Sequence, residues 1–430
     1  MTAQDLLKDI NFENLNYTMT AKHNIIKVIG VGGGGCNAVA NMYNEGVEGV
    51  TFVVCNTDDQ ALQNSPIPNQ ILMGDAGLGA GNDPEKARLA AESSLEEITK
   101  MLVDNPDETT NKDGSLKVNT HMAFITAGMG GGTGTGAAPV IAEACQKLGI
   151  LTVGIVTIPF DFEPRKKMRQ ALDGIAKMSP YLDSLLVIRN DQIRVIFPDS
   201  NFADSMKIAD SVLASAATSI VEIITKHGYI NVDFADVYTT LKNGGRTIMN
   251  FGQASGEHRV ARAIHEAMNT PLLFEYDAKN TKKVLLALYT SHTNQIIMEE
   301  TREIKDFMET FDDEIDFIWG AFYDDSLGDE VKITLLATCS DESVVPREIE
   351  TLLDKDGLPV PTTVGKNRVL SIADLDDEVR HRVLVLDGTQ RRHRYRRGRN
   401  RNLVPQEHRE RRRRAPHGNV ANLPERVTLD

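Results

Sequence analysis

Cysteine, tryptophan and long apolar runs are all scarce in this chain of 430 residues. Its four cysteines (Cys36, Cys55, Cys145 and Cys339) show no C-x-x-C spacing and no paired histidines nearby, which excludes a disulfide-stapled scaffold and indicates neither a zinc site nor a redox motif. No stretch reaches the roughly 18 uncharged apolar residues of a membrane span, and the first twenty residues lack the apolar core of a signal peptide. We therefore expect a soluble, cytoplasmic protein with reduced, buried cysteines.

Positive charge is also scarce, except at the C-terminal end. The chain has 47 Lys and Arg against 61 Asp and Glu, a formal charge of −14, but residues 380–430 hold 15 Arg, no Lys and 5 acidic residues. This tail therefore carries +10 and the body before it −24. So acidic a body is a poor general nucleic-acid surface, and we expect no sequence-specific nucleic-acid partner. The composition beyond residue 340 predicts a disordered linker followed by an Arg-rich tail.

Short apolar runs alternate with helical patterns over the first half of the chain. The runs are rich in Val and Ile, nearly uncharged and bounded by Gly, Asn, Asp or Pro, and we predict buried strands at 25–31, 51–56, 121–126, 151–158 and 185–190. A helix is predicted from Asp83 and Pro84, where Asp can cap the first turn and Pro suits the first helical position, and its apolar face continues to Ile98. This alternation predicts an α/β fold with a doubly wound, mostly parallel sheet.

A long apolar stripe without Gly or Pro over residues 203–226 predicts a core helix that joins two domains. After it, strands are predicted at 247–253, 283–290, 315–323 and 331–339, with helices at 257–268 and 293–308. The predicted organisation is a flexible N-terminal extension (1–21), a Rossmann-like nucleotide-binding domain (22–202), the central core helix (203–226), a smaller α+β domain (227–340) and a disordered tail (341–430).

Two glycine clusters each follow a predicted strand and precede a predicted helix. The first, at residues 30–37, has four consecutive glycines, a pattern that fits a Rossmann dinucleotide site or a plain tight turn as well as other phosphate sites. The second, at residues 128–136, can wrap backbone amides around phosphate oxygens, and a dinucleotide enzyme needs no second such loop. Neither cluster carries the lysine of a P-loop, so amides, a helix dipole and a metal ion must neutralise the phosphate charge. Helices are predicted from about Asn37 and Ala137.

The segment G-G-G-T-G-T-G at 130–136 resembles the signature loop of the tubulin and FtsZ superfamily. Four further motifs occur in matching order, at 77–82 (GLGAGN), 159–163 (PFDFE), 190–191 (ND) and 231–236 (NVDFAD). From about residue 22 to 340 the chain is similar to the cell-division GTPases of that superfamily. The resemblance implies that it binds GTP or GDP with Mg²⁺, hydrolyses GTP, and assembles head to tail into filaments that form the division scaffold in the cytoplasm at mid-cell.

The resemblance also assigns the phosphate-binding residues. The α- and β-phosphates would be cradled by Gly33, Gly34, Gly35, Cys36 and Asn37, and the β- and γ-phosphates by Gly132, Thr133 and Gly134. The loop containing Ala80 and Gly81 would close around the γ-phosphate and Mg²⁺ together with Asn56 and Asp58. For Asp58, a helix N-cap is an equally good reading of the sequence.

For the sugar and the base, the resemblance places Glu163 at the ribose hydroxyls and Asn190 at the sugar or base. Asp210 would accept from the N1–H and N2 amino group that guanine has and adenine lacks, with a solvated helix charge as the alternative. Two positions depart from the family pattern: Lys167 replaces the usual Arg, and Met206 replaces the Phe that stacks on the base in many members. We expect GTP binding to survive with weaker affinity.

The candidate catalytic element contains Asn231, Asp233 and Asp236. Two carboxylates three residues apart share one face of a helix and could polarise a water, although N-capping of the following helix by Asp236 is the alternative. A helix of roughly 20 residues, about 30 Å long, separates them from the glycine loops. The resemblance resolves this separation, because in the family this loop reaches the nucleotide of the next subunit.

Two other functions remain as alternatives. A Rossmann-type oxidoreductase is disfavoured by the second glycine loop and by the lack of an obvious hydride-transfer His or Lys, and a relative that binds GTP but barely hydrolyses it is disfavoured by Asp233 and Asp236. The resemblance implies that membrane-tethering and other division proteins bind the tail, yet no segment matches the family's docking peptide well. The arginines at 391–401 and 409–414 could contact anionic lipid, nucleic acid or the acidic bodies of other filaments, or act as a solvated spacer.

Overall fold

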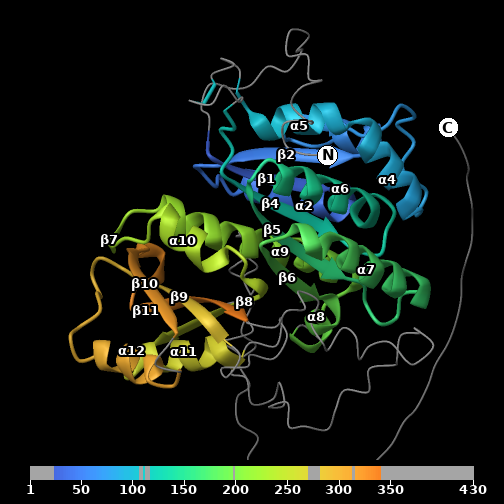
Figure 1. The fold of residues 1–430 in the computed structure, drawn as a ribbon. Helices are drawn as coiled ribbons and strands as arrows, with labels where there is room; N and C mark the ends of the chain where they lie inside the picture. Colours follow the sequence, from blue (N-terminus) through green and yellow to red (C-terminus); the bar gives the residue numbers. More distant parts are fainter. Residues whose placement is uncertain are drawn as a thin grey trace, which may run out of the picture. The chain divides into compact units, whose positions relative to one another are not determined.

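The computed structural model describes residues 24–105, 110–111, 117–196, 199–269, 281–311 and 315–339. Within these ranges eleven strands are ordered β3-β2-β1-β4-β5-β6-β8-β11-β9-β10-β7 (Figure 1). The first six pair in parallel: β3 Asn69–Leu72, β2 Thr51–Asn56, β1 Ile26–Val31, β4 Met122–Gly128, β5 Leu151–Ile158 and β6 Ser184–Arg189. This confirms the predicted α/β fold with a parallel sheet, while the predicted N-terminal extension and tail lie outside the described residues.

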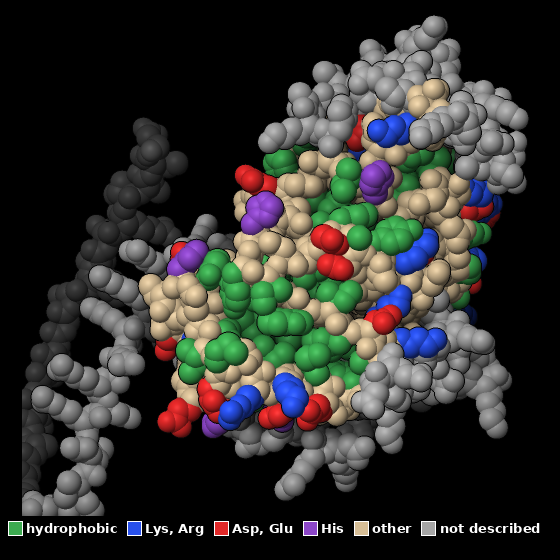
Figure 2. Space-filling model, turned by 60° about the vertical axis from the view of Figure 1, so that its left-hand side comes forward, with side chains coloured by type: hydrophobic (Ala, Val, Ile, Leu, Met, Phe, Trp, Pro, Cys, Tyr) green, Lys and Arg blue, Asp and Glu red, His purple; other side chains and the backbone are tan. Residues whose placement is uncertain are grey.

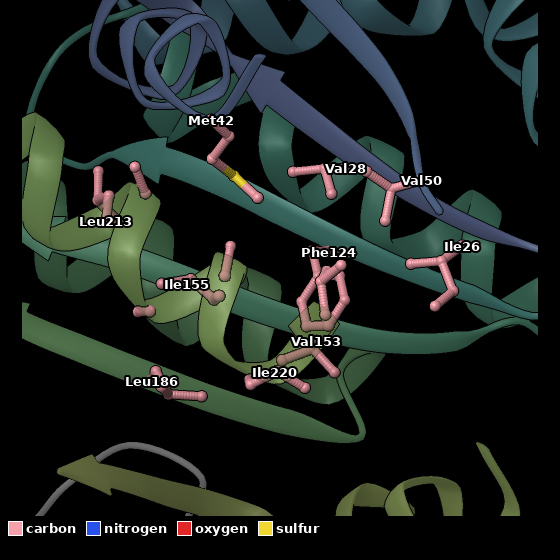
Figure 3. Packing of buried hydrophobic residues seen from close by; sticks show 14 of the residues in the cluster. Ile26, Val28, Met42, Val50, Phe124, Val153, Ile155, Leu186, Leu213 and Ile220 are labelled. Carbon is pink, nitrogen blue, oxygen red and sulfur yellow. The ribbon is translucent and has the colours of Figure 1, made fainter. Parts of the chain in front are cut away.

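Helices cover both faces of the parallel strands. On one face α2 (Gly32–Asn44) and α9 (Phe202–Thr225) pack against Val28, Phe124 and Ile155 (Figure 3). On the other face lie α4 (Pro84–Ser93), α5 (Leu95–Val103), α6 (Thr133–Lys147) and α7 (Arg165–Met178). Burial of the strands on both sides explains why their sequences are continuous apolar runs rather than alternating ones.

The second half of the sheet is mixed. It contains β8 Gly245–Ser255, β11 Glu330–Cys339, β9 Thr281–Thr290, β10 Asp316–Tyr323 and the short β7 Gly228–Ile230. Helices α11 (Arg259–Asn269) and α12 (Thr301–Met308) pack on one face of it. Only two residue pairs, Ser184 with Gly245 and Leu185 with Arg246, join β8 to β6.

Helix α9 lies in the core between the two halves of the sheet. Its Leu213, Ala217 and Ile220 belong to the same buried cluster as Leu186 of β6 and Leu285 of β9. By length and composition the segment Ala203–Thr225 could cross a membrane, but half of its most apolar window is buried inside the protein. Its place between the two halves agrees with the predicted core helix.

Several predicted helix boundaries were wrong. Helix α2 begins at Gly32 rather than near Asn37, and α6 at Thr133 rather than near Ala137, so the glycines themselves form the first turns. The helix predicted over 293–308 begins only at Thr301. The helix from Pro84 ends at Ser93, and a second one starts at Leu95.

Candidate functional site

The two glycine loops touch each other at the carboxyl ends of the neighbouring strands β1 and β4. Gly32 has φ +71°, and a Cβ there would lie 2.8 Å from the backbone nitrogen of Gly134. A Cβ on Gly34 would lie 3.6 Å from the Cα atom of Gly128. Both helices that start here, α2 and α6, direct free backbone N–H groups to this edge of the sheet, which makes it an anion site.

Neighbouring glycines of the first loop have different surroundings. A Cβ on Gly35 would lie 2.1 Å from the carbonyl oxygen of Thr126, so this glycine permits the close packing of α2 on β4. A Cβ on Gly33 would meet no described atom within 4 Å, so this position faces open space. Gly33 therefore remains available to a ligand, whereas Gly35 is structural.

A third loop, at residues 77–82, lies against the second glycine loop. A Cβ on Gly132 would lie 2.9 Å from the Cβ of Ala80, and Gly81 has φ +63°. The hydroxyls of Thr57 and Thr133 are hydrogen-bonded at 2.8 Å. Sequence reasoning missed Thr57, although its position between Asn56 and Asp58 could have drawn attention to it.

Asn56 and Asp58 both make local hydrogen bonds. The Asn56 side-chain oxygen accepts from the Thr57 amide at 2.8 Å. Asp58 is the N-cap of α3 (Asp59–Gln63), and its Oδ1 accepts from the amides of Gln60 and Ala61 at 3.0 and 3.3 Å. The N-cap alternative for Asp58 is thus realised.

Asp210 of α9 faces the first glycine loop. Its Oδ2 accepts from Asn37 Nδ2 at 3.0 Å, and its Oδ1 is 3.8 Å from the Cβ position of Gly34. Burial raises the pKa of the Asp210 carboxyl to about 6, and the hydrogen bond from Asn37 opposes that rise. Asp210 is thus a partly buried, hydrogen-bonded carboxylate.

The other predicted contacts with the ribose and base lie around the start of α8 (Asn190–Ile196). Asn190 is buried, and its Oδ1 finds no hydrogen-bond partner among the described residues. Glu163 accepts from the Phe160 amide at 3.1 Å and pairs with Lys167 at 2.7 Å. Lys167 is therefore bound to the carboxylate rather than extended as a lone phosphate-binding cation.

The side chains of two further predicted site residues contact other residues of the protein. Met206 packs against the small cluster of Phe160, Ile193 and Ala209. Cys36 is buried with its Sγ 3.6 Å from the carbonyl oxygen of Gly30, and burial raises the pKa of this thiol to about 12. Only the backbone of Cys36 is thus suited to a nucleotide contact.

The candidate catalytic pair forms the first turn of α10 (Phe234–Leu241). Asp233 Oδ1 accepts from the Asp236 amide at 2.9 Å, and Asp236 Oδ2 accepts from the Asp233 amide at 3.1 Å. Asn231 Oδ1 accepts from the Gly228 amide at 2.7 Å. The capping alternative is therefore realised as a reciprocal capping box, with Asp233 rather than Asp236 as the N-cap.

This pair lies at the edge of the sheet opposite to the glycine loops. The Phe234 ring is 6.2 Å from the ring of His121, which directly precedes β4, whereas Gly128 ends that strand. A seven-residue strand spans roughly 20 Å, and the 24 residues of α9 span about 36 Å. Asp233 and Asp236 thus stand far from the glycine loops of their own chain.

A parallel sheet whose carboxyl edge gathers two glycine loops and a partly buried Asp is the arrangement of a nucleotide-binding domain. The family model described as "Tubulin/FtsZ family, GTPase domain" matches residues 25–198, and the one described as "FtsZ family, C-terminal domain" matches residues 245–341. The chain belongs to the FtsZ family. This confirms the predicted activity, a GTPase of the cell-division cytoskeleton that binds guanine nucleotide.

Individual relatives are similar over most of the chain. It is 46% identical over 328 residues to the cell division protein FtsZ of Porphyromonas gingivalis, covering 76% of this chain and 69% of the relative. It is 40% identical over 343 residues to the cell division protein FtsZ 2 of Rhizobium meliloti, covering 78% and 94%. Among solved structures, an FtsZ dimer from M. jannaschii matches with a TM-score of 0.65 at 37% identity, covering 74% of this chain and 88% of that one.

Proposed function

We propose that this chain assembles head to tail into filaments in which the Asp233 and Asp236 pair of one subunit hydrolyses GTP held by the next. The observation that carries the proposal is the placement of the glycine loops and the acidic pair at opposite edges of the sheet. A contact that joins two different faces of identical subunits and does not close on itself generates a filament. The names of the relatives, cell division proteins and an FtsZ dimer, support the same function.

The nucleotide would lie across the carboxyl edge. Backbone amides of Gly33 to Gly35 and Gly132 to Gly134, with the two helix N-termini, would bind the phosphates without a lysine. The orphan acceptor of Asn190 suits a ribose hydroxyl or a base N–H. Asp210, held by Asn37, would accept from the N1–H and N2 amino group of guanine.

Mg²⁺ would be held mainly through water and phosphate oxygens. In the described ranges no group of three His, Cys, Asp or Glu side chains is placed to hold a metal ion directly. Asp58 uses Oδ1 for both of its capping bonds, so Oδ2 can accept from a metal-bound water. When bound, a hard divalent cation supplies charge neutralisation on the β- and γ-phosphates.

The capping box leaves each catalytic carboxylate one further oxygen, Oδ2 of Asp233 and Oδ1 of Asp236. A water that enters between the subunits can donate to these oxygens, which orients its lone pair toward the γ-phosphorus. As the new P–O bond forms, a carboxylate oxygen accepts the proton of the water, and the bond from the γ-phosphorus to the β,γ-bridging oxygen breaks, so that GDP leaves. The reciprocal bonds fix both carboxylates on a rigid helix turn. Hydrolysis would therefore occur only where a second subunit closes the site.

Filaments of this kind would act in the cytoplasm at mid-cell, with membrane-tethering and other division proteins bound to the C-terminal tail. The Arg-rich stretches at 391–401 and 409–414 lie outside the described residues, and their charge supports contact with anionic surfaces. Sedimentation with anionic vesicles, with and without residues 380–430, tests that contact. Equal binding of both forms would exclude it.

The shared site is tested by measuring phosphate release and light scattering together over a range of protein concentrations. We expect both signals to appear above the same threshold concentration, because a lone subunit has no complete site. A constant rate per subunit in dilute protein that does not scatter would contradict the proposal.

A further inference from the structure

Three rings contact one another in series beside the catalytic element. The imidazole of His292 stacks on Tyr323 with ring centroids 3.9 Å apart and an interplanar angle of 16°, and Tyr323 packs on Tyr229 at 5.1 Å with a tilted interplanar angle of 41°. Figure 2 shows the side of the molecule that carries β7 and α10, where hydrophobic side chains lie beside histidines and acidic side chains. We call Tyr229, Tyr323 and His292 the ring stack.

Asp325 fixes the outer end of the ring stack. Its carboxylate accepts from the backbone amide of His292 at 2.9 Å and contacts Nδ1 of the same residue at 2.9 and 3.1 Å. These bonds from His292 hold the pKa of the Asp325 carboxyl below its ordinary value. The backbone amide and the ring nitrogen Nδ1 of His292 are therefore both bonded to a single carboxylate, although His292 and Asp325 are more than half exposed.

The inner end of the ring stack leads directly into the catalytic element. Tyr229 is the middle residue of β7, which ends one residue before Asn231. β7 has three residues at the edge of the sheet, and its register with β10 is broken by an irregularity between Ala321 and Phe322. So short a strand is only weakly stabilised by its own backbone hydrogen bonds. The contact of the Tyr229 ring with Tyr323 therefore adds a second interaction that keeps β7 in place.

The start of the catalytic element is coupled to this strand. Asn231 Oδ1 accepts from the Gly228 amide at 2.7 Å, so the turn into Asp233 closes back onto β7. A shift of β7 along β10 therefore moves Asn231 and, two residues later, the capping box. Catalysis by carboxylates loses much of its rate when the groups move by about 1 Å.

We propose that Tyr323 and His292, held by Asp325, are positioning residues that set where the catalytic pair meets the neighbouring nucleotide. They touch neither GTP nor the water themselves and act through Tyr229 and β7. This inference rests on the proposed function, because it requires that Asp233 and Asp236 perform the hydrolysis.

The test compares full-length variants above the assembly threshold. Turnover is measured per sedimented subunit, GTP affinity in dilute protein, and the thermal midpoint by fluorescence. Tyr323→Leu and His292→Ala should each lower turnover roughly fivefold, the factor that corresponds to an aromatic pair of about 1 kcal/mol. GTP affinity should stay unchanged, because the glycine loops lie at the other edge of the sheet.

Two variants separate positioning from general damage. His292→Phe keeps a ring over Tyr323 and the backbone bond of residue 292 to Asp325 while losing the Nδ1 contact, and it should recover most of the turnover that His292→Ala loses. Tyr43→Leu removes a tyrosine with the same 42% exposure as Tyr229 from an aromatic pair on α2 and β2, and it should leave turnover per sedimented subunit unchanged.

Asp233→Asn is measured alongside as a reference. If Asp233→Asn loses turnover while Tyr323→Leu and His292→Ala keep it, the inference about the ring stack is wrong and the shared site stands. If Asp233→Asn keeps turnover, the proposed function itself is wrong. The positioning role would also be wrong if the lower turnover of Tyr323→Leu came with an equal loss of GTP affinity. It would likewise be wrong if Tyr43→Leu lowered turnover by the same factor.

Discussion

The side-chain amide of Asn37 donates to the carboxylate of Asp210 at 3.0 Å, joining residues that lie 173 positions apart in the sequence. Asn37 belongs to α2 and Asp210 to α9, so this bond couples the phosphate loop to the helix that runs through the core. Burial of the carboxylate opposes its ionisation and raises its pKa to about 6. Ionisation of Asp210 is therefore unfavourable in the free protein, and hydrogen bonds from the edge of a guanine would offset this unfavourable free energy.

Asp210→Asn should therefore weaken GTP binding and stabilise the free protein. Losing a charged acceptor for two guanine donors should raise the Kd roughly 10- to 100-fold. Removing the buried charge should raise the free energy of unfolding at pH 7 by about 1–3 kcal/mol. Nucleotide titration and chemical denaturation measure the two effects, and Asp204→Asn, an exposed carboxylate on the same helix, is the control. Unchanged affinity would remove Asp210 from base recognition.

GTP affinity should depend on pH through Asp210. The pKa of this carboxyl in the folded protein is raised to about 6, so its contribution to stability is complete below the ordinary value of 3.8 and is lost as pH rises through about 6. Reading guanine requires the ionised form, so affinity should fall up to about tenfold per pH unit below pH 6. Titrations from pH 5 to 7.5 with wild type and Asp210→Asn isolate this effect, because protonation of the nucleotide itself is common to both proteins. If GTP affinity changed with pH in the same way in both proteins, Asp210 would not be the group that reads guanine.

Asp233→Asn should abolish most turnover while keeping the fold of α10. Asparagine retains the N-cap bond to the Asp236 amide but removes the charge, so stability should change by less than about 0.5 kcal/mol. Asp233→Ala removes both and should also cost about 1 kcal/mol in unfolding free energy. Phosphate release and denaturation of the two variants separate catalysis from capping. If Asp233→Asn keeps full turnover, the carboxylate serves the helix alone.

Alanine substitutions at two glycines of the first loop, only two residues apart, should have different consequences. Gly33→Ala should fold like the wild type and bind GTP more weakly, because its Cβ would enter the open space left for the nucleotide. Gly35→Ala should fail to fold normally, because its Cβ would lie 2.1 Å from the Thr126 carbonyl oxygen. Thermal unfolding and nucleotide titration distinguish the two outcomes. A stable Gly35→Ala protein would show that α2 can move away from β4.

Loss of one partner of the buried ion pair between Lys27 and Asp104 should destabilise the fold more than loss of both. Its atoms are 2.7 Å apart and both side chains are fully buried, and burial lowers the pKa of Lys27 while Asp104 opposes that shift. Asp104→Asn leaves an uncompensated buried charge and should cost about 3–5 kcal/mol of unfolding free energy, whereas Lys27→Met combined with Asp104→Leu should recover most of it. Denaturation of the single and double variants measures both. If the single and double variants lost the same unfolding free energy, packing rather than charge would determine the stability at this position.

The sequence predicted the central strands well because burial on both faces makes each a continuous apolar run. It missed β3 and β7, which are short, lie at edges of the sheet and include polar or glycine residues. It placed the starts of α2 and α6 too late because glycine has low intrinsic helix propensity. At both sites tertiary packing overrides that propensity, with Gly35 against Thr126 and Gly136 against Pro84.

The candidate site residues could be proposed from motifs, but most of their contacts could not. No local pattern reveals that Asn37 meets Asp210 or that Thr57 meets Thr133. The pair of Glu163 with Lys167 differs, because its i,i+4 spacing is itself a local signal. The late start of α12 has a non-local origin, because Arg259 of α11 bonds Glu300 and the carbonyls of Asn294 and Gln295. These bonds hold residues 294–300 outside the helix.

In the proposed head-to-tail filament, the opposite placement of the glycine loops and the candidate catalytic pair would make the two ends chemically different. At one end the last subunit would present a nucleotide that no carboxylate pair reaches, and at the other it would present a carboxylate pair with no nucleotide to act on. The number of active sites would therefore be one fewer than the number of subunits. Short filaments would hydrolyse less GTP per subunit than long ones. The nucleotide of the terminal subunit would stay unhydrolysed, because no neighbouring carboxylate pair reaches it.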